Sequence, residues 1–397
     1  MQNLLRFFLF SLVGLLPALA QRDIGTVDVI AENKTVPIRV SANEPALNQL
    51  ALQAFTAHGR YRLVASGFAY DIRFAQVTAN QVRVDITRGG GGGVVHSETV
   101  TGTDLRNSLL RAADVAVERT NGVGLRGFFA AKLAFIGERT GRKEVYTSDL
   151  FFGDVKQLTR DNAQALTPRW SPDGSRIVYT SYFRSGFPDI FQIDLKTYQR
   201  STFVSFKGTN SGARFSPDGR QVAMVLSGEG NAEIYVGNAQ GKQIRRMTRT
   251  DAVEASPSFS PDGSRLVFTS DAAGGPQLYL MSVAGGGMQR IPTNISGYCA
   301  EPDWNRVDPN KIAFTIRIGR GYQVAVYDFA KRASTQASRA PFDGIEPSWL
   351  PDGRHLVYTA RDRNTSRLCI LDTETGRSTP LSPTNFGPTL QGSVWMP

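Results

Sequence analysis

Short apolar runs bounded by Gly, Pro and Asp fill residues 131–397, and this pattern is typical of many short strands joined by tight turns. The run at Arg169-Trp170 meets Ser-Pro-Asp-Gly and is followed by a second apolar run ending at Tyr179, which predicts two strands and a turn. Related motifs recur at positions 171, 216, 260, 305 and 350, in steps of 44 or 45 residues. A repeat of roughly 40–50 residues in strand-rich units predicts a β-propeller.

The first repeat is incomplete, and this predicts how the ring closes. Residues 132–160 contain three predicted strands, at 132–138, 144–150 and 155–159, but not the strand that precedes the Ser-Pro-Asp-Gly turn elsewhere. The last residues of the chain, 392–397, have the pattern of that missing strand. We therefore expect the C-terminal strand to complete the first blade. The result is an all-β six-bladed propeller over residues 126–397, closed so that two sheet edges are covered.

Residues 21–125 follow a different pattern, which predicts a small α+β domain. Apolar residues at helical spacing predict a helix over 45–58, with Leu47, Leu50 and Phe55 on its buried face, and a second helix over 104–119. Pro37 falls within a predicted strand and indicates an edge strand or loose pairing. The predicted strands are 24–30, 36–40, 61–65, 70–77, 81–88 and 94–100.

Residues 1–20 are expected to form a secretory signal peptide. Arg6 precedes an apolar core from Phe7 to Leu16, and Ala18-Leu19-Ala20 offers a cleavage site, so the mature chain would begin at Gln21. The apolar core is too short for a membrane span. In an oxidising compartment the two cysteines could pair, but the fold does not require it, and two free thiols are favoured. These cysteines are Cys299 and Cys369.

The chain carries 45 Lys and Arg against 35 Asp and Glu, a net charge of +10. A basic surface suits nucleic acid, anionic lipid or an acidic protein partner. The positive charges are scattered rather than clustered into a run that could follow a phosphate backbone, so no nucleic-acid partner is expected. We expect a monomer without cofactor or metal, which is peripheral to membranes only through its partners.

No pattern in the sequence predicts a catalytic site. The motifs GxSxG and HExxH are absent, and the run Gly89–Gly93 is expected to be a mobile hairpin tip, since no phosphate-loop Lys follows it. Asp173, Asp218, Asp262 and Asp352 recur in register, but Asp at such a turn bonds the nearby backbone, which favours a structural role. Propeller serine peptidases need a hydrolase domain after similar blades, and we expect none here. A glycosidase has no local motif and is not excluded.

A binding scaffold is the remaining interpretation. In a propeller, the loops entering each inner strand share one face with the loops between second and third strands, opposite the Ser-Pro-Asp-Gly turns. Aromatic and Arg side chains on such loops are typical of protein-binding hot spots. The acidic or polar residues predicted around the channel mouth are Asn162, Asn210, Glu254, Glu301, Asp343 and Glu346. The basic and aromatic residues predicted outside them are Tyr182, Phe183, Arg184, Phe187, Arg317, Arg320, Tyr322, Arg361 and Arg363.

The chain resembles the TolB family, the periplasmic β-propeller component of the Tol-Pal system. The resemblance rests on the order of signal peptide, small domain and Ser-Pro-Asp-Gly blades, with Trp395-Met396-Pro397 at the end of the chain. The junction segment 121–136 and the motif Gln157-Leu158-Thr159 before the first complete repeat are also similar to the family. The similarity covers nearly the whole mature chain and is strong from about residue 121 onwards.

The resemblance implies a non-catalytic periplasmic adaptor. In the family, channel-face loops bind the peptidoglycan-associated lipoprotein Pal, and an N-terminal arm binds the inner-membrane protein TolA. A change in the amount of Pal bound to the propeller would then support envelope integrity and constriction at cell division. Carried over by position, the Pal-binding residues are Thr209, Asn210, Gly212, Glu254, Ala255 and Ser256, to which the channel-mouth residues Glu301 and Glu346 are added. The corresponding arm residues are Asp28, Val29 and Ile30.

Two features depart from the family pattern. The family often places a His where this chain has Thr209, and the small domain is shorter, with Gly89–Gly93 in place of part of it. A second hypothesis therefore stays open: an extracytoplasmic propeller that binds a glycan, peptide or small ligand, or that assists a hydrolase. A deep channel lined by convergent polar groups would favour this second hypothesis, whereas an aliphatic plug would count against it.

Overall fold

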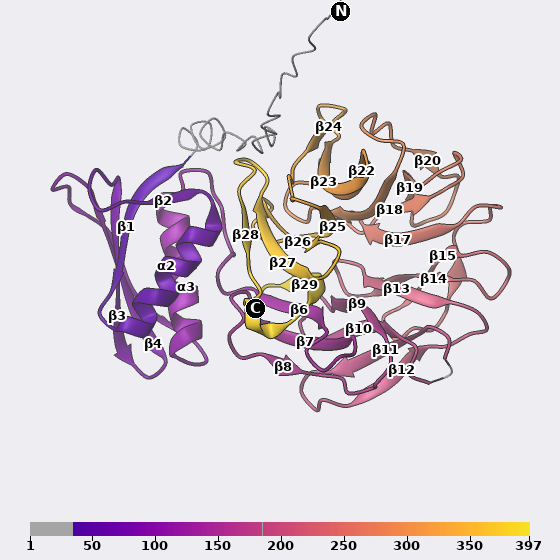
Figure 1. Cartoon of the computed structure of the whole chain (residues 1–397), viewed down its shortest axis with the longest axis horizontal. Helices are drawn as coiled ribbons and strands as arrows, with labels where there is room; N and C mark the ends of the chain where they lie inside the picture. The colour runs from indigo at the N-terminus through magenta and orange to yellow at the C-terminus, as the bar shows by residue number, and fades with distance from the viewer. Residues whose placement is uncertain (1–34, 185) are drawn as a thin grey trace, which may run out of the picture.

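The computed structural model describes residues 35–184 and 186–397 (Figure 1). A small domain of two helices and a five-stranded sheet lies beside a ring of six four-stranded sheets. This arrangement confirms the predicted fold class, a small α+β domain followed by a six-bladed β-propeller. The predicted signal peptide 1–20, its cleavage after Ala20 and the predicted strand 24–30 lie outside the described residues.

The small domain packs its helices on the side of its sheet that faces the propeller (Figure 1). The order of strands in the sheet is β2-β1-β3-β4-β5. The elements are β1 (Val36–Ala42), α2 (Pro45–His58), β2 (Tyr61–Leu63), β3 (Tyr70–Thr78), β4 (Gln81–Arg88), β5 (Val94–Thr101) and α3 (Leu105–Thr120).

Pro37 does not mark an edge strand, and that prediction was wrong. Strand β1 lies between β2 and β3 and pairs with both in parallel. The pairing with β3 begins only at Ile38, opposite Tyr70, so the missing N–H of Pro37 removes no bond from this ladder. The carbonyl oxygen of Pro37 is still used, since it accepts a hydrogen bond of 2.8 Å from the backbone N–H of Ala69.

Both helices begin and end as the sequence predicts. Pro45 opens α2, where its missing N–H has no intrahelical role, and Gly59 follows the helix with φ of 75°. Asp104 caps α3 by accepting a hydrogen bond of 2.8 Å from the backbone N–H of Asn107. Leu47, Leu50 and Phe55 are buried against the sheet, as their helical spacing requires.

Each blade of the propeller is an antiparallel sheet of four strands, whose first strand is innermost. Blade 1 contains β29 (Thr389–Trp395), β6 (Lys132–Gly137), β7 (Glu144–Asp149) and β8 (Lys156–Gln157). Blade 2 contains β9 (Ala165–Trp170), β10 (Arg176–Ser181), β11 (Asp189–Asp194) and β12 (Arg200–Val204). Blade 3 contains β13 (Asn210–Phe215), β14 (Gln221–Leu226), β15 (Glu233–Asn238) and β16 (Arg245–Arg246).

The last three blades repeat this plan. Blade 4 contains β17 (Glu254–Phe259), β18 (Arg265–Ser270), β19 (Gln277–Ser282) and β20 (Gln289–Arg290). Blade 5 contains β21 (Cys299–Trp304), β22 (Lys311–Ile318), β23 (Gly321–Asp328) and β24 (Ala333–Gln336). Blade 6 contains β25 (Asp343–Trp349), β26 (His355–Arg361), β27 (Ser366–Asp372) and β28 (Ser378–Pro380). A short 3-10 helix, Thr384–Phe386, precedes β29.

The C-terminal strand closes the ring, as predicted. Strand β29 pairs antiparallel with β6, from Thr389 opposite Gly137 to Trp395 opposite Lys132. The indole of Trp395 stacks on that of Trp170 in the next blade, with ring centroids 5.5 Å apart. Its N–H donates a hydrogen bond of 3.0 Å to the carbonyl oxygen of Pro172, so the closing strand is attached to blades 1 and 2.

The Ser-Pro-Asp-Gly motif is a turn between the first and second strands of a blade. In blade 2, the Ser171 hydroxyl donates to Asp173, and the backbone N–H of Arg176 donates to the same hydroxyl at 2.9 Å. Gly174 has φ of 68°, a value that glycine adopts without strain. The recurring Asp side chains are therefore used within their own turns. We call this end of the propeller the turn face and the opposite end the loop face.

Apolar clusters between neighbouring blades form most of the propeller core. Cys299 and Cys369 are buried and form no disulfide, which confirms the prediction of free thiols. Over the ranges 35–184 and 186–397, no helix is long and apolar enough to cross a membrane.

Candidate functional site

A ring of six residues, one from the inner strand of each blade, lines the propeller channel. Each has positive φ, between 48° and 64°, and lies where the pairing of the first two strands shifts by a β-bulge. A bulge turns the extra residue out of the ladder and re-aims its side chain. The ring consists of Thr167, Gly212, Ser256, Glu301, Glu346 and Gln391. We call it the bulge ring.

Hydrogen bonds across blade boundaries hold part of the bulge ring together. Glu301 accepts from the backbone N–H of Glu346 at 3.0 Å and from the Thr315 hydroxyl at 2.7 Å. The Gln391 amide donates to Glu346 at 2.8 Å, and its oxygen accepts from the backbone N–H of Thr167 at 2.7 Å. The ring therefore links blades 5, 6, 1 and 2 through side chains as well as through packing.

The bulge ring surrounds a cavity of about 110 Å³ that also touches Arg169 and Arg214. Burial, together with the carboxylate of Glu346, raises the pKa of Glu301 above its usual value. Burial and the neighbouring guanidinium of Arg214 lower the pKa of Arg169 to about 9. The channel is therefore polar and charged, and no aliphatic plug fills this cavity.

Two of the predicted partner-binding residues are fully buried, each as the first residue of an inner strand. Asn210 accepts from the backbone N–H of Phe206 at 2.9 Å and donates to the carbonyl oxygen of the same residue at 2.8 Å. Glu254 accepts from the hydroxyls of Ser270, at 2.7 Å, and Thr250, at 2.9 Å, and burial raises its pKa. Both side chains fix the shape of the loops that enter blades 3 and 4.

The other predicted residues lie in and beside the channel. The structure brings Gly212, Ser256, Glu301 and Glu346 together around the bulge-ring cavity. Thr209, just before β13, and Ala255, on β17, are half-buried and do not line that cavity. The predicted arm residues Asp28, Val29 and Ile30 lie outside the described residues.

The loop face carries exposed apolar and basic side chains around the channel mouth. A cavity of about 840 Å³ between the loops of blades 5 and 6 is lined by Arg320, Arg339, Phe342, Arg361 and other residues. Phe342 is 58% exposed there. Arg361 pairs with Asp343 at 2.8 Å, whereas Arg320 and Arg339 form no ion pair within the described ranges.

The sequence predicted three arginines of this cavity, Arg320, Arg361 and Arg363, but not Arg339 or Phe342. It also missed Phe206 and Val253, which are exposed on the loops entering blades 3 and 4. A signal was available, because each of these loops carries one large apolar residue shortly before the inner strand, where burial is not required.

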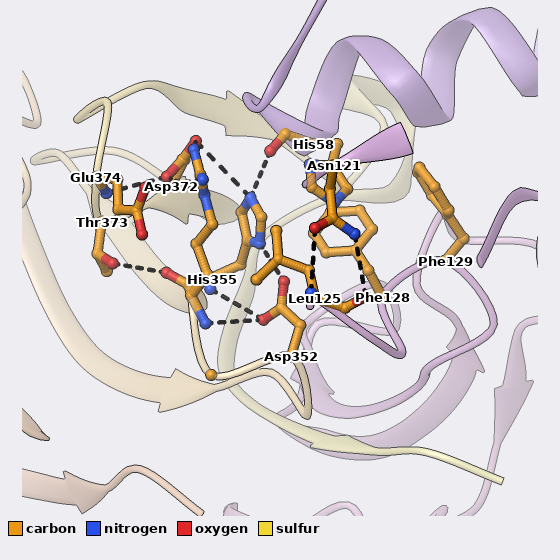
Figure 2. Close-up of polar contacts among 12 residues, drawn as sticks. His58, Asn121, Leu125, Phe128, Phe129, Asp352, His355, Asp372, Thr373 and Glu374 are labelled. Carbon is orange, nitrogen blue, oxygen red and sulfur yellow. Dashed lines mark hydrogen bonds and ion pairs between the residues drawn. The ribbon is translucent and has the colours of Figure 1, made fainter. Parts of the chain in front are cut away.

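Figure 2 shows the junction between the two domains, where His355 at the start of β26 meets the end of α2. The Nδ1 atom of His355 bonds to Asp352 at 2.5 Å, and its Nε2 atom bonds to the backbone carbonyl oxygen of His58. Arg354 donates two hydrogen bonds, of 2.9 and 2.7 Å, to Asp372, which is the second buried carboxylate at the junction. The bond from His355 to His58 attaches the small domain to the turn face of blade 6, and the other contacts hold His355 and Arg354 in place within that blade.

The linker between the domains is held by Asp114 of α3. Its carboxylate accepts hydrogen bonds of 2.7 to 2.9 Å from three successive backbone N–H groups, those of residues 128–130. Burial raises the pKa of Asp114 to about 6, although these three bonds act in the opposite direction. The side chain of Asn121 also bonds to the carbonyl oxygen of Leu125 (Figure 2). The entry to the propeller is therefore fixed on the small domain.

His58, Asp352 and His355 form a cluster whose possible metal-ligand atoms lie within 4.8 Å of one another. Both ring nitrogens of His355 are already hydrogen-bonded, so its contacts fit a hydrogen-bonded network better than a metal centre. The ring of His58 is buried on Phe128, at a centroid distance of 4.4 Å, and neither nitrogen has a partner among the described residues. Burial and the nearby His355 lower the pKa of His58 well below its usual value, so the ring is neutral.

Comparison with curated proteins finds relatives named for the Tol-Pal system. The chain is 35% identical to the Tol-Pal system protein TolB of Desulfosudis oleivorans over 147 residues, which is 37% of this chain and 33% of that protein. It is 31% identical to the protein of the same name from Bordetella pertussis over 206 residues, 52% of this chain and 44% of that protein. The matched segments thus span less than half of these relatives. Their names agree with the prediction of a non-catalytic protein.

Comparison with solved structures extends the similarity to both domains. The crystal structure of TolB from Acinetobacter baumannii matches with a TM-score of 0.79 and 25% identity, covering 91% of this chain and 96% of that one. A putative TolB from Agrobacterium tumefaciens matches in fold, with a TM-score of 0.52 and 17% identity over 67% of this chain and 98% of that one. A family model described as the TolB beta propeller domain matches residues 120–397, and the chain therefore belongs to the TolB propeller family.

Proposed function

We propose that the chain is a periplasmic, non-catalytic adaptor of the Tol-Pal system, and that its loop face binds a Pal-like outer-membrane lipoprotein. Membership of the TolB family supports the first part of this proposal. The predicted signal peptide, with cleavage after Ala20, supports the proposed periplasmic location.

The loop face carries the second part of the proposal. Exposed aromatic and Arg side chains dominate the energetics of protein interfaces, and they gather here around the channel mouth. Phe206 and Val253 project from loops that enter blades 3 and 4, and Phe342 lies among the arginines of blades 5 and 6. This cluster of exposed side chains is the observation that carries the function.

The predicted partner-binding residues have two roles in this proposal. Asn210 and Glu254 hold the loops in one shape, which lowers the conformational cost of binding. The remaining residues are accessible at or near the channel and are proposed to contact the partner. They are Thr209, Gly212, Ala255, Ser256, Glu301 and Glu346.

The arm and the mechanism are proposed from the family resemblance. Asp28, Val29 and Ile30 would belong to an N-terminal arm that binds a TolA-like inner-membrane protein. Binding of the lipoprotein to the loop face would compete with the lipoprotein's attachment to peptidoglycan. The inner-membrane partner would change how much of the lipoprotein is bound to the loop face. The adaptor would thereby support outer-membrane integrity and constriction at cell division.

A binding titration tests this function. Mature chain, residues 21–397, is titrated with the purified Pal-like domain of the same organism, and a second chain that lacks residues 21–34 but keeps β1 is compared. We expect both chains to bind the Pal-like domain, and only the longer one to bind a TolA-like domain. Failure of the mature chain to bind any Pal-like domain of its organism would overturn the proposal.

One observation favours the second candidate, a propeller that binds a small ligand in its channel. The bulge-ring cavity is lined by converging polar and charged side chains, among them Arg169, Glu301 and Gln391. The two candidates share Gly212, Ser256, Glu301 and Glu346, so a ligand in the bulge-ring cavity would compete with a partner that contacts these residues.

A further inference from the structure

Three arginines from three blades line one cavity at the turn-face end of the channel. Arg169 of blade 2, Arg214 of blade 3 and Arg306 of blade 5 surround a volume of about 190 Å³. A water molecule takes roughly 30 Å³ of liquid, so the cavity can hold a small organic molecule. Arg169 and Arg214 also line the bulge-ring cavity, so the two cavities share these residues.

Among these three arginines, only Arg214 forms an ion pair with a described residue. Arg214 pairs with Asp303, whose second oxygen accepts a hydrogen bond of 2.7 Å from the backbone N–H of Trp349. Arg169 donates at 3.1 Å to the carbonyl oxygen of Pro168 and makes no ion pair with a described residue. Arg306, exposed at the cavity rim, likewise has no ion pair in the described part of the chain.

The position of Arg169 makes its charge costly. Burial and the guanidinium of Arg214 lower its pKa to about 9, which means that its surroundings disfavour the cation. Asp303, Glu346 and Glu301 all favour the charged form of Arg169, but the pKa of Glu301 is itself raised by burial and by Glu346. A buried charge is stable when it is paired, so an anion in this cavity would complete the arrangement.

The cavity walls are aromatic and apolar. The lining includes four tryptophans and Met396, and the tryptophans are Trp170, Trp304, Trp349 and Trp395. Their four indole N–H groups are already donated to backbone carbonyl oxygens, at 2.9 to 3.1 Å. These indoles therefore offer only ring surface, and the arginines supply the charged hydrogen-bond donors of the cavity. This combination suits an anion that carries an apolar body.

We propose that the turn-face end of the channel is a binding site for a carboxylate attached to an apolar group, held by Arg169, Arg214 and Arg306. The carboxylate lies between the guanidinium groups, and the apolar group lies against the indoles. Such a ligand could be a free organic acid or the C-terminal carboxylate of a peptide, which share this chemistry. The site is at the opposite end of the channel from the exposed residues of the loop face, and it shares Arg169 and Arg214 with the bulge-ring cavity.

Calorimetric titration of the mature chain tests this site. The probes are hexanoate, its uncharged analogue hexanamide, inorganic phosphate, and the dipeptide Ala-Leu with a free or an amidated C-terminus. We expect hexanoate, the free dipeptide or both to bind, and both amides to bind at least about tenfold more weakly, because a charge-assisted hydrogen bond is lost. The two acids together identify which source of carboxylate fits. Equal binding of acid and amide, or phosphate binding as tight as that of the better acid, would overturn the proposal.

Variants assign the binding to the arginines. Arg169→Met and Arg306→Met should each lower, by about tenfold, the affinity for whichever of the two acids binds more tightly. The matched control is Arg220→Met, because Arg220 lies on the turn face outside the cavity and should leave the affinity unchanged. Arg306 is exposed, so its variant keeps the test valid even if Arg169→Met does not fold. Unchanged affinity in Arg306→Met would contradict the site.

Discussion

The imidazole Nε2 of His355 in the propeller bonds to the backbone carbonyl oxygen of His58, which ends helix α2 of the small domain 297 residues earlier. The other ring nitrogen bonds to the carboxylate of Asp352. Carbonyl and carboxylate oxygens only accept hydrogen bonds, so both ring nitrogens carry protons and His355 is an imidazolium. The adjacent ring of His58 is neutral and has no hydrogen-bond partner among the described residues. The domain junction thus combines a charged histidine with an uncharged one.

Raising the pH should weaken the junction through His355. Burial lowers its pKa, but the carboxylates of Asp352 and Asp372 outweigh this effect and the pKa is raised overall. A raised histidine pKa contributes stability that is complete below the unfolded value of about 6.5 and is lost as the pH rises through the folded value. The free energy of unfolding, measured in urea from about pH 6 to pH 9, should therefore contain a falling contribution from His355.

The variant His355→Phe isolates that contribution. It leaves Asp352 buried without its cation, so it should lower the free energy of unfolding at pH 6 by about 3–5 kcal/mol. The difference from the wild type should shrink as the pH rises through the raised pKa of His355, because the wild-type histidine then loses its proton. A difference that stays constant over this range would contradict the charged state assigned to His355.

Replacing His58 should have the opposite effect. The change His58→Phe removes two buried ring nitrogens without partners, each a polar group that costs about 1–3 kcal/mol when unsatisfied, and keeps the backbone carbonyl that receives His355. Because the lowered pKa of His58 penalises folding below the unfolded value of about 6.5, the gain should be larger at pH 5 than at pH 8. Thermal unfolding at the two pH values measures it. A loss of stability at pH 5 would show that the His58 ring has a partner.

Neutralising Glu301 should stabilise the propeller at high pH. Its raised pKa means that the folded chain disfavours the carboxylate, so the cost grows as the pH rises from the unfolded value of about 4.3 through the folded value. Glu301→Gln can still accept hydrogen bonds from Thr315 and Glu346, and it should gain of the order of 1 kcal/mol at pH 8 and less at pH 5. The control Glu118→Gln, at an exposed position on α3, should show no such difference.

Removing residues 392–397 should open the ring. The deletion removes the pairs that β29 makes with β6 from Ser393 onwards and the stacking of Trp395 on Trp170. It would expose an edge of β6, so we expect a lower thermal midpoint and concentration-dependent association, measured by calorimetry and light scattering. Deleting only Met396 and Pro397 keeps the paired residues and serves as the control. Equal behaviour of the two deletions would show that closure does not depend on this pairing.

The propeller was predictable because its information is local and repeated. The Ser-Pro-Asp-Gly turn uses bonds within a few residues, as Ser171 and Asp173 do, and it recurs often enough to give the period and the missing strand. The prediction of an edge strand from Pro37 was wrong because a proline can lie in a central strand when pairing with one neighbour begins after it. Strand β1 pairs with β3 only from Ile38 onwards. Where pairing begins is set by the whole sheet rather than by the segment.

The candidate site was less predictable because it depends on contacts between distant segments. The loops were placed on the correct face, but the sequence does not reveal that Asn210 and Glu254 turn inward. The bulge ring needs the register of two strands, which apolar patterning alone does not give. The bond from His355 to His58 joins two domains, and no local sequence pattern around either residue predicts it.

A pair of matched valine variants tests the central claim, that the loop face binds a Pal-like lipoprotein. Val253 is 48% exposed on the loop face, and Val307 is 59% exposed on the turn face. Each is changed to Asp in the mature chain and titrated with the Pal-like domain of the same organism. The account predicts that Val253→Asp weakens binding by about tenfold or more, since a charge is buried in the interface, and that Val307→Asp binds as the wild type does. Equal affinity of both variants, or a loss confined to Val307→Asp, would contradict it.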